Sequence, residues 1–323
     1  MMSTPKSTLT IGSRGSPLAL WQANWVKDTL QNHFPQLVVE ITIIKTTGDK
    51  ILDSPLSKIG DKGLFTREIE RALLDRAIDC AVHSLKDLPT ELPKGLVIGA
   101  ITQREDVHDV FVGNANKNYK HLDDIPSGGT IATGSLRRKC QLLNWRPDLN
   151  IAELRGNLNT RFSKLDASNW DGMILARAGV IRLGWEERIT EIIPFERMLP
   201  AVGQGALGIE MRSDDNQTLK MIKPLESIPT TYSTLGERAL LRELEGGCQV
   251  PIGTHGRIEK SEFKLDAVVG SLDGRKIVRG KIHGTPENSE ELGVQLAHIL
   301  LKSGAKEILE SIRTQATQEL PNV

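Results

Sequence analysis

Cys248 has the surroundings that most favour covalent chemistry. It directly follows Gly246 and Gly247, so its sulfur lies on a stretch of chain with almost no side-chain cover. A thiol in that setting can be reached and modified by a small molecule. The alternative is a tight turn that contains a small buried cysteine, since free cysteine is often buried. The spacing of these three residues leaves both interpretations open.

A basic stretch in the middle of the chain indicates a local anionic ligand. Between Ser135 and Lys164 there are seven Lys or Arg and only two Asp or Glu. The whole chain is balanced, with 41 residues of each sign. A solvated helix face is the alternative interpretation of the same charges.

Two segments read as a short apolar strand, a break at Ser or Gly, and then a helix. The strands are residues 9–12 and 130–133, and the helices begin near Pro17 and Leu136. Ser16 is a good N-cap and Pro17 suits the first helical position. Each helix start presents free backbone N–H groups with arginine nearby, so each could bind a carboxylate or phosphate. A capped helix needs no ligand, however.

Reactive side chains follow the predicted strands. A helix over residues 66–76 leads into a strand at 79–82, and Ser84, Lys86 and Asp87 come next. A second strand, 173–176, also precedes basic residues. Ligands of α/β sheets bind beyond the carboxyl ends of the strands. The alternation of strands and helices predicts largely parallel sheets with helices on their faces.

The pattern changes after Pro224. Residues 263–269 and 276–279 read as strands joined by a hairpin at 273–274, and helices are expected over 289–302 and 305–312 with Gly304 as a C-cap. This predicts a small α+β domain, and it would carry Cys248.

Composition excludes several functional classes. A chain of 323 residues is long enough for two or three domains. Balanced charge and 4% aromatic residues argue against nucleic-acid binding. The cysteines are odd in number and widely spaced, which predicts a reducing compartment and no metal site. No signal sequence or membrane-length apolar run is present, so we expect a cytoplasmic protein. Residues 48–63 could form a lid over a site, or an ordinary surface loop.

Six segments together resemble the porphobilinogen deaminase family, also called hydroxymethylbilane synthases. They occur in the expected order over nearly the whole chain, and they are Ser13-Arg14-Gly15-Ser16-Pro17-Leu18-Ala19-Leu20-Trp21, Ala81-Val82-His83-Ser84-Leu85-Lys86-Asp87, Gly134-Ser135-Leu136-Arg137-Arg138, Leu154-Arg155-Gly156-Asn157, Leu199-Pro200-Ala201-Val202-Gly203-Gln204-Gly205-Ala206 and Leu244-Glu245-Gly246-Gly247-Cys248-Gln249-Val250-Pro251. Any one segment would be weak, but the ordered set is specific.

The resemblance implies a transferase of tetrapyrrole and heme biosynthesis. Four porphobilinogen molecules would be joined head to tail, each losing ammonia, into linear hydroxymethylbilane. The chain would grow on a dipyrromethane cofactor bound through a thioether to Cys248. Each pyrrole ring carries an acetate and a propionate, and arginine pairs such carboxylates bidentately.

The resemblance also implies roles for individual residues. Asp87 matches the catalytic aspartate, which would stabilise positive charge on the pyrroles and assist proton transfer. An N-cap or an ion pair with Lys86 is the plain alternative for Asp87. The carboxylates of cofactor or substrate would be held by Arg14, Ser16, Lys62, Ser84, Lys86, Thr133, Ser135, Arg137, Arg138, Arg155, Arg161 and Arg182.

The implied fold has three domains, the first two resembling periplasmic binding proteins with the active site in their cleft. We place domain 1 at residues 1–103 plus 205–223, domain 2 at 104–204 and domain 3 at 224–323. The first two would be mixed α/β and the third a small α+β domain. The protein is expected to be a monomer with porphobilinogen as its partner.

Three positions depart from the family pattern, and two other functions compete. His108, Arg177 and Cys80 replace commoner residues, while Cys80 and Cys140 are interpreted as structural.

A non-catalytic two-lobed clamp for a carboxylated ligand fits the composition equally well, but it would need neither Cys248 nor Asp87. A thiol-nucleophile transferase would need a partner for the thiol, and the nearest candidate, His255, lies in no dyad motif.

Overall fold

The computed structural model describes residues 7–50, 63–244 and 250–318. They group into two compact units. The first contains residues 7–50, 63–105 and 205–231, and the second contains 106–204, 232–244 and 250–318.

The first unit is built on a five-stranded sheet in the order β2-β1-β3-β10-β4. The strands are β1 (Thr8–Ser13), β2 (Val38–Ile43), β3 (Cys80–Ser84), β4 (Leu96–Ile101) and β10 (Leu207–Arg212). Its helical segments are α1 (Pro17–His33), α2 (Thr47–Lys50), α4 (Arg67–Leu74), η1 (Leu85–Asp87), α8 (Asn216–Ile222) and η4 (Lys223–Leu225). Helix α9 (Ile228–Glu243) begins in this unit and continues in the second.

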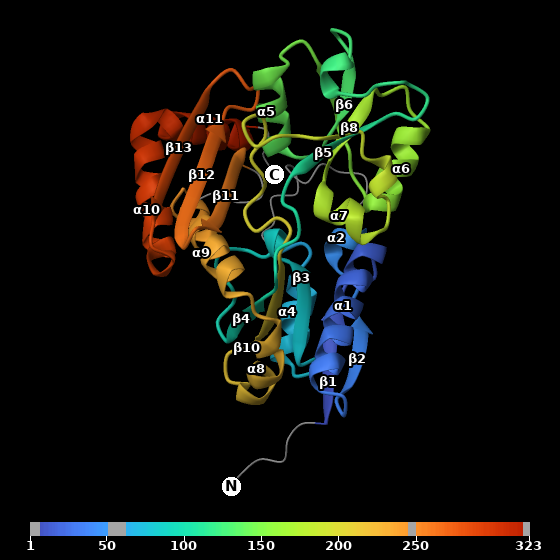
Figure 1. The fold of residues 1–323 in the computed structure, drawn as a ribbon, viewed down its shortest axis with the longest axis vertical. Helices are drawn as coiled ribbons and strands as arrows, with labels where there is room; N and C mark the ends of the chain where they lie inside the picture. Colours follow the sequence, from blue (N-terminus) through green and yellow to red (C-terminus); the bar gives the residue numbers. More distant parts are fainter. Residues whose placement is uncertain (1–6, 51–62, 245–249, 319–323) are drawn as a thin grey trace. The chain divides into compact units, whose positions relative to one another are not determined.

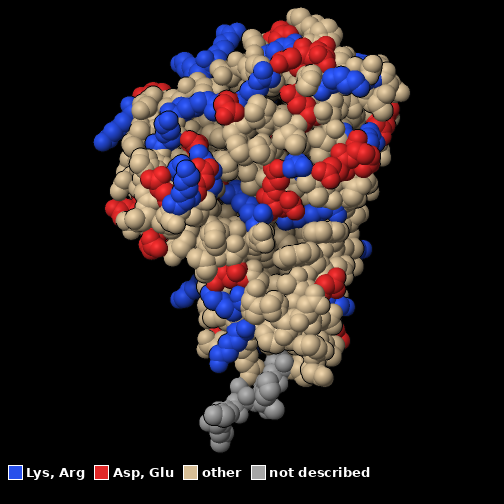
Figure 2. All heavy atoms as spheres, viewed as in Figure 1, with Lys and Arg blue, Asp and Glu red and all other residues tan. Residues whose placement is uncertain are grey.

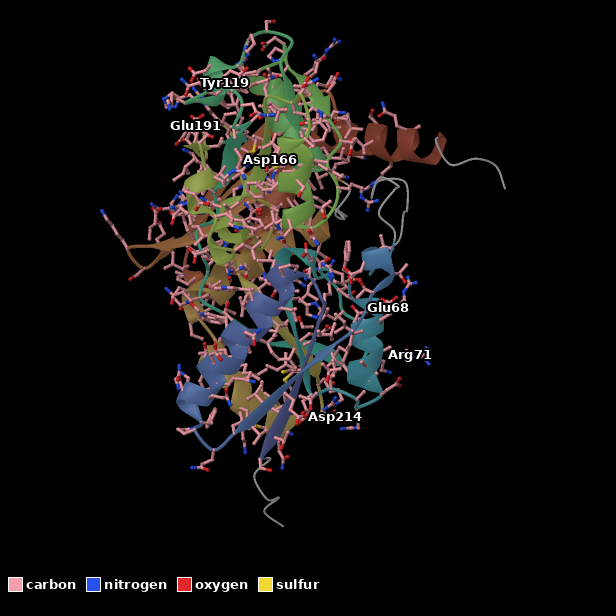
Figure 3. The ribbon with its side chains drawn as sticks, turned by 90° about the vertical axis from the view of Figure 1, so that its right-hand side faces the viewer. Glu68, Arg71, Tyr119, Asp166, Glu191 and Asp214 are labelled. Carbon is pink, nitrogen blue, oxygen red and sulfur yellow. The ribbon has the colours of Figure 1, made fainter. Side chains whose placement is uncertain are left out.

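Helices α1 and α4 bury their apolar sides against this sheet. Ala23, Val26 and Leu30 of α1 pack in one core cluster with β1, β2, β3 and β10. Ile69 and Leu73 of α4 pack in a separate cluster. The charged side of α4 faces outward, and Figure 3 shows Arg71 extending away from the ribbon.

The second unit contains two sheets. The first, in the order β7-β6-β8-β5-β9, consists of β5 (Asp109–Gly113), β6 (Thr130–Ala132), β7 (Asn150–Ala152), β8 (Gly172–Ala176) and β9 (Glu191–Ile192). Its helical segments are η2 (Leu122–Asp124), α5 (Leu136–Trp145), α6 (Leu158–Asp166), α7 (Arg177–Arg182) and η3 (Glu186–Arg188).

The other sheet is an antiparallel meander, β11-β12-β13, made of β11 (Ile252–Glu259), β12 (Glu262–Gly270) and β13 (Ile277–Gly284). It is followed by η5 (Pro286–Asn288), α10 (Ser289–Leu300), the π-turn η6 (Leu301–Ala305) and α11 (Lys306–Gln318). Figure 1 shows α10 lying along this sheet, and Leu296, Ala297 and Leu300 of the helix share its core.

The expected local structures are largely confirmed. Ser16 caps α1 by accepting a hydrogen bond from the Ala19 N–H, and Pro17 is the first helical residue. Ser135 caps α5. Gly304 has φ of 107° between α10 and α11, as a glycine C-cap requires. Strand β11 was not anticipated from the sequence.

The prediction of largely parallel sheets needs one correction in each five-stranded sheet. Strands β1, β2 and β3 are parallel, but β10 runs antiparallel to both β3 and β4. Likewise β5 runs antiparallel to β8 and β9. Both β5 and β10 enter their sheets from segments outside the regular strand–helix alternation, which is why the alternation did not reveal them.

The division into three domains stays a prediction. The second compact unit contains both the β5–β9 sheet and the β11–β13 sheet, which were assigned to domains 2 and 3. The two parts touch within this unit: the Asn144 side chain of α5 donates a hydrogen bond of 2.9 Å to the Gly274 backbone carbonyl.

Charged residues of both signs alternate on the face shown in Figure 2, as the balanced composition implies. Within the described ranges, no helix is both long and apolar enough to cross a bilayer.

Candidate active site

Asp87 lies in a small pocket of the first unit, at the end of β3. The pocket is also lined by Arg14, Ser16, Gln22 and Ser84. The Asp87 side chain is exposed, and none of the described residues donates a hydrogen bond to its carboxylate or pairs with its charge. The alternatives of an N-cap or an ion pair with Lys86 therefore find no support among the described contacts.

The local fold explains why Asp87 is presented in this way. Residues 80–83 are buried as the central part of β3, and the 3-10 turn η1 follows at once. Leu85 is 1% exposed and its N–H donates to the Ala206 carbonyl, which anchors the turn. The half-buried Lys86 and the exposed Asp87 extend from an anchored turn rather than from a loose loop.

Ser16 and Ser84, two of the predicted carboxylate-binding residues, line the same pocket, and each has a hydroxyl proton available for donation. Ser16 Oγ accepts from the Ala19 N–H at 3.3 Å, and Ser84 Oγ accepts from Gln22 Nε2 at 2.9 Å. Neither hydroxyl donates to another described residue. A hydroxyl that already accepts a hydrogen bond keeps its own proton for an acceptor such as a carboxylate.

Arg14 is also in the pocket lining, but it is engaged with protein groups. Its guanidinium binds the Asp49 carboxylate through Nε and Nη2 and lies 4.2 Å from the centre of the Phe65 ring. Burial acts to raise the pKa of Asp49, but the hydrogen bonds and charge of Arg14 outweigh it and lower that pKa. Asp49 was not anticipated from the sequence.

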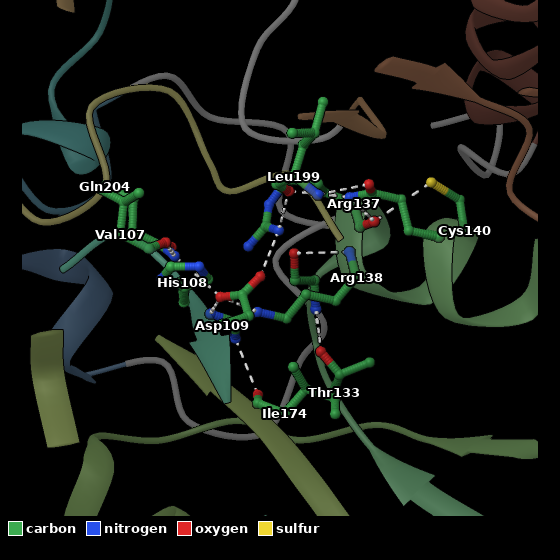
Figure 4. A network of polar contacts seen from close by, with 12 residues as sticks. Val107, His108, Asp109, Thr133, Arg137, Arg138, Cys140, Ile174, Leu199 and Gln204 are labelled. Atoms are coloured by element: carbon green, nitrogen blue, oxygen red, sulfur yellow. Dashed lines mark hydrogen bonds and ion pairs between the residues drawn. The ribbon is translucent and has the colours of Figure 1, made fainter. Parts of the chain in front are cut away.

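In the second unit, Arg137 and Arg138 share one buried carboxylate (Figure 4). Arg137 Nη1 lies 2.6 Å from Asp109 Oδ2, and Arg138 Nη2 lies 2.8 Å from Oδ1. Gln204 Nε2 donates to the same Oδ1 at 3.0 Å. Asp109 is fully buried, and both arginines are more than nine-tenths buried. The cluster of two arginines and one aspartate carries a net charge of +1.

Opposing effects set the ionisation of Asp109. Burial alone would raise its pKa, because a carboxylate loses hydration in the interior. The charges and hydrogen bonds of Arg137 and Arg138 overcome that effect and hold the pKa well below its usual range. Asp109 is therefore a carboxylate that positions the two arginines.

Arg155 has a donor that no described residue satisfies. Its Nη1 atom is buried and has no hydrogen-bond partner among the described residues. A buried, unpaired guanidinium nitrogen costs free energy, so a carboxylate ligand at this atom would be stabilising. Thr133 is 2% exposed and its Oγ1 accepts from the Ser135 N–H, which again leaves a hydroxyl proton available.

The remaining predicted basic residues of this unit are partly exposed. Arg161 Nε donates to the Gly156 carbonyl at 2.9 Å. Arg182 is the last residue of α7 and is half-buried. Lys62 and Cys248 lie outside the described residues. Cys80 and Cys140 are free and buried, and burial raises the pKa of Cys140 to about 12, which agrees with their structural interpretation.

Two of the unusual residues meet at one carboxylate. His108 Nδ1 lies 2.6 Å from Asp106 Oδ1, and Arg177 binds Asp106 Oδ2. The Phe195 ring contacts two histidine rings. Its centroid lies 3.9 Å from that of the stacked His108 ring and 4.1 Å from that of the tilted His255 ring. These substitutions thus form a local ion-pair and ring cluster of their own.

Sequence reasoning missed the acidic partners of the arginines. Asp109 is the first residue of the apolar strand β5, between His108 and Val110, and a lone buried carboxylate in such a strand must be paired. That signal was present, but only the structure could show which arginines supply the pairing.

The described donors fit a polycarboxylate such as dipyrromethane. The unpaired Arg155 nitrogen, the net positive Arg137–Arg138 cluster and the free hydroxyl protons of Ser16, Ser84 and Thr133 are all groups that carboxylates bind. Each unit, considered by itself, therefore contains hydrogen-bond donors suited to ligand carboxylates.

Comparison with known proteins gives consistent matches over almost the whole chain. Residues 9–220 match the family model "Porphobilinogen deaminase, dipyromethane cofactor binding domain", and residues 231–302 match "Porphobilinogen deaminase, C-terminal domain". A relative named porphobilinogen deaminase from Chlorobium phaeobacteroides is 52% identical over 95% of this chain and 99% of its own length. The protein of the same name from Chlorobaculum tepidum is 53% identical with the same coverage.

Solved structures match this chain only at low similarity. The periplasmic VFT2 domain of Bordetella pertussis BvgS has a TM-score of 0.41 and 12% identity, covering 71% of this chain and 88% of that one. The periplasmic aliphatic sulphonate binding protein SsuA of Escherichia coli has a TM-score of 0.39 and 14% identity, covering 75% of this chain and 71% of that one.

Proposed function

The chain belongs to the porphobilinogen deaminase family, and we propose that it joins four porphobilinogen molecules into hydroxymethylbilane with separate residues for catalysis, carboxylate binding and cofactor attachment. The family assignment makes it a transferase of tetrapyrrole and heme biosynthesis that uses a dipyrromethane cofactor. The roles of individual residues are the proposal.

Asp87 is the catalytic carboxylate. It is exposed in a pocket, and no described group satisfies it, so it is free to face positive charge that develops on a substrate pyrrole. At about 4 Å and an effective dielectric near 20, a carboxylate stabilises a unit positive charge by about 4 kcal/mol. The same carboxylate can accept and return a pyrrole proton.

Ser16, Ser84, Arg14 and Lys86 bind substrate or cofactor carboxylates in the first unit. The two hydroxyls have protons to donate, and the anchored η1 turn fixes Lys86 beside Asp87. Arg14 is held by Asp49, which limits the orientations of its guanidinium. Fixed donors bind without first losing side-chain entropy, which favours affinity.

Arg137, Arg138, Arg155, Arg161, Arg182, Thr133 and Ser135 bind carboxylates in the second unit. Asp109 neutralises one of the two adjacent arginines and orients both. The remaining single positive charge can attract an anion. The unpaired Arg155 nitrogen adds a donor whose satisfaction favours the bound state.

Cys248 and Lys62 complete the proposed set, although both lie outside the described residues. Cys248 would bind the cofactor as a thioether, with Gly246 and Gly247 leaving room for it. When bound, dipyrromethane supplies the pyrrole end to which the first substrate molecule is added. Lys62 would contact a carboxylate.

The protein is proposed to work as a cytoplasmic monomer without a nucleic-acid partner. Its balanced charge and low aromatic content support the absence of nucleic-acid binding. A non-catalytic clamp is not favoured, because the full-length relatives are named as deaminases.

The observation that carries this proposal is the exposed Asp87 carboxylate, which has no partner among the described residues, in a pocket with carboxylate-binding donors. The test is incubation of purified protein with porphobilinogen. We expect porphobilinogen to be consumed with release of ammonia and a linear tetrapyrrole. Tight binding of porphobilinogen without consumption would instead identify a clamp.

A further inference from the structure

Gln141 of helix α5 is a buried amide with no part in the proposed function above. It is 1% exposed and lies one helical turn after Arg137. Its Nε2 donates to the backbone carbonyls of Leu199 at 3.0 Å and Arg137 at 3.2 Å. Its Oε1 accepts from the Leu199 N–H at 2.8 Å. Both N–H bonds and the oxygen of this amide are therefore used inside the second unit.

Leu199 lies in a buried segment without a strand partner. Residues 199–201 belong to neither a helix nor a strand, and Leu199 is 4% exposed. A backbone N–H and C=O at such a position must find partners. Gln141 bonds to both groups, as a neighbouring strand would. The amide of Gln141 therefore fixes the direction of the Leu199 carbonyl.

Strand β11 holds the other side of this segment. The Thr254 N–H donates to the Pro200 carbonyl at 2.8 Å. A Cβ atom at Gly253 would lie only 2.8 Å from the Leu199 carbonyl oxygen, so glycine is what permits this close approach. The segment is thus held between α5 and β11, and the Leu199 carbonyl has little room to move.

The Leu199 carbonyl helps to orient the Arg137 guanidinium (Figure 4). Arg137 Nη1 has two protons; it donates to Asp109 Oδ2 at 2.6 Å and to the Leu199 oxygen at 2.7 Å. Both protons of Nη1 are therefore engaged by acceptors that are themselves held in place. Because a guanidinium is planar, fixing Nη1 at two acceptors also fixes the directions of Nε and Nη2.

The Nε and Nη2 atoms of Arg137 remain available to a ligand. Neither atom hydrogen-bonds to a described residue. Neither is among the fully buried atoms that lack a partner, so each keeps some contact with solvent although the side chain is only 6% exposed. Nε–H and Nη2–H lie on one edge of the guanidinium, and this edge can bind a carboxylate through two parallel hydrogen bonds.

Arg138 shows what the same carboxylate does to an arginine held differently. It binds Asp109 Oδ1 through its own Nε at 3.2 Å and Nη2 at 2.8 Å. In Arg138 the Nε–Nη2 edge is thus occupied by a protein carboxylate. Without the Leu199 acceptor, Arg137 is free to turn the same edge toward Asp109, and that edge would then be lost to a ligand.

We propose that Gln141 is a positioning residue for cofactor loading. It acts through the Leu199 carbonyl to keep the Nε–Nη2 edge of Arg137 open to a ligand carboxylate. The inference rests on the proposed role of Arg137 in binding the carboxylates of dipyrromethane or porphobilinogen. Gln141 itself touches neither ligand, and its amide makes and breaks no covalent bond.

The first test compares Gln141→Met with Asn114→Leu, which removes another buried amide from the same unit. Asn114 is 2% exposed, and its Nδ2 donates to the carbonyls of Leu165, Ser168 and Trp170. Cofactor-free full-length proteins are incubated with porphobilinogen, and the gain in intact mass gives the loading rate. We expect Gln141→Met to load about tenfold more slowly, because one charge-assisted contact is lost, and Asn114→Leu to load like the wild type. Equal loading rates of the two variants would overturn the proposal.

The second test asks whether Gln141 acts through Arg137. Arg137→Lys keeps the positive charge but removes the two-pronged edge. In that background, adding Gln141→Met should not slow loading further, because the edge that Gln141 positions is already absent. A purely structural role would instead give the same factor in both backgrounds. An additional loss of about tenfold in the double variant would therefore overturn the proposal.

A spectroscopic test needs no variant at Gln141. The Nε–Hε signal of Arg137 in ¹H–¹⁵N spectra is assigned by its loss in Arg137→Lys. We expect this signal to move when the wild type is loaded, because a ligand carboxylate joins that edge. An Arg137 signal that loading leaves in place would overturn the proposal, even where Gln141→Met does not fold.

The same signal separates this inference from the proposed function. In cofactor-free protein, the Arg137 signal should move in Gln141→Met and stay in place in Asn114→Leu. That comparison reports the positioning by Gln141 without any reaction. If the proposed function were wrong, the wild type itself would gain no mass from porphobilinogen. A wild type that loads, with the same cofactor-free Arg137 signal in both variants, would overturn only the role of Gln141.

Discussion

Arg137 Nη1 lies 2.6 Å from Oδ2 of the fully buried Asp109, and the other oxygen of the same carboxylate binds the neighbouring Arg138. One acidic residue thus fixes the orientation of two arginines that we propose bind ligand carboxylates. The consequence is that these arginines depend on Asp109 both for stability and for position.

Replacing Asp109 by Asn should be strongly destabilising. Breaking a buried ion pair by removing one partner costs about 3–5 kcal/mol, because buried charge is left uncompensated. Urea denaturation of wild type and Asp109→Asn measures this loss. The control is Asp166→Asn, which breaks an exposed pair with Arg188 and should cost about 1 kcal/mol or less.

The contribution of Asp109 to the free energy of unfolding should also depend on pH, and it should be lost at acid pH. The folded-state pKa is lowered below the unfolded value of about 3.9, so the stabilisation is complete above that value and is lost as the pH falls toward the folded-state pKa. The stability difference between wild type and Asp109→Asn should be constant from about pH 5 to 8 and shrink below about pH 4. A difference that shrinks instead toward alkaline pH would contradict the assignment.

Replacing Asp87 by Asn should stop the chemistry and spare the fold. The side chain is exposed and has no described partner, so the free energy of unfolding should change by less than about 0.5 kcal/mol. Loss of about 4 kcal/mol of electrostatic stabilisation corresponds to about a thousandfold slower condensation. Single-turnover kinetics on preloaded protein is the measurement. Asp75→Asn, an exposed carboxylate in the same unit, is the matched control, and an Asp87→Asn rate within tenfold of wild type would remove Asp87 from the catalytic role.

Replacing Arg155 by Leu should reduce cofactor loading with little loss of stability. Its Nη1 donor has no described partner to lose, whereas a charge-assisted hydrogen bond to a ligand is worth about 1.5–3 kcal/mol. We expect roughly 10- to 100-fold weaker loading, measured by the fraction of protein that retains the cofactor after dialysis. Arg188→Leu, an arginine engaged only with Asp166 and the Phe162 ring in the described contacts, should load normally. Equal loading of the two variants would assign Arg155 to the protein surface.

Cysteine reactivity separates the three thiols. Cys80 and Cys140 are buried, and the high pKa of Cys140 keeps it protonated, so neither should react with a thiol reagent in the folded protein. Cofactor-free protein should show one reactive thiol, at Cys248, and cofactor-loaded protein none. Two or more reactive thiols in the folded protein would contradict the structural interpretation of Cys80 and Cys140.

The parts of this account that follow local rules could be predicted from the sequence. The sequence predicts Ser16 as an N-cap and Gly304 as a C-cap, because each depends on a few neighbouring residues. The end of β3 was recognised as the place for Asp87 because chemistry in such sheets lies beyond the strands.

The long-range pairings could not be predicted from the sequence. Asp109 and Arg137 are 28 residues apart, and His83 and Glu210 belong to strands that are far apart in the sequence. An isolated charge in an apolar strand signals that a partner exists but does not identify it. The reversed direction of β5 and β10 was missed for the same reason, since strand direction depends on the route of the chain and not on local composition.

The central claim, that Cys248 carries a covalent dipyrromethane, is tested most directly by the intact mass of the purified protein. We predict that active wild-type protein is heavier than its sequence by two linked pyrrole units, and that Cys248→Ser lacks this excess and is inactive. Cys140→Ser should keep the excess mass, because that thiol is buried and has no part in attachment. A fully active wild type whose mass equals that of its sequence would contradict the account.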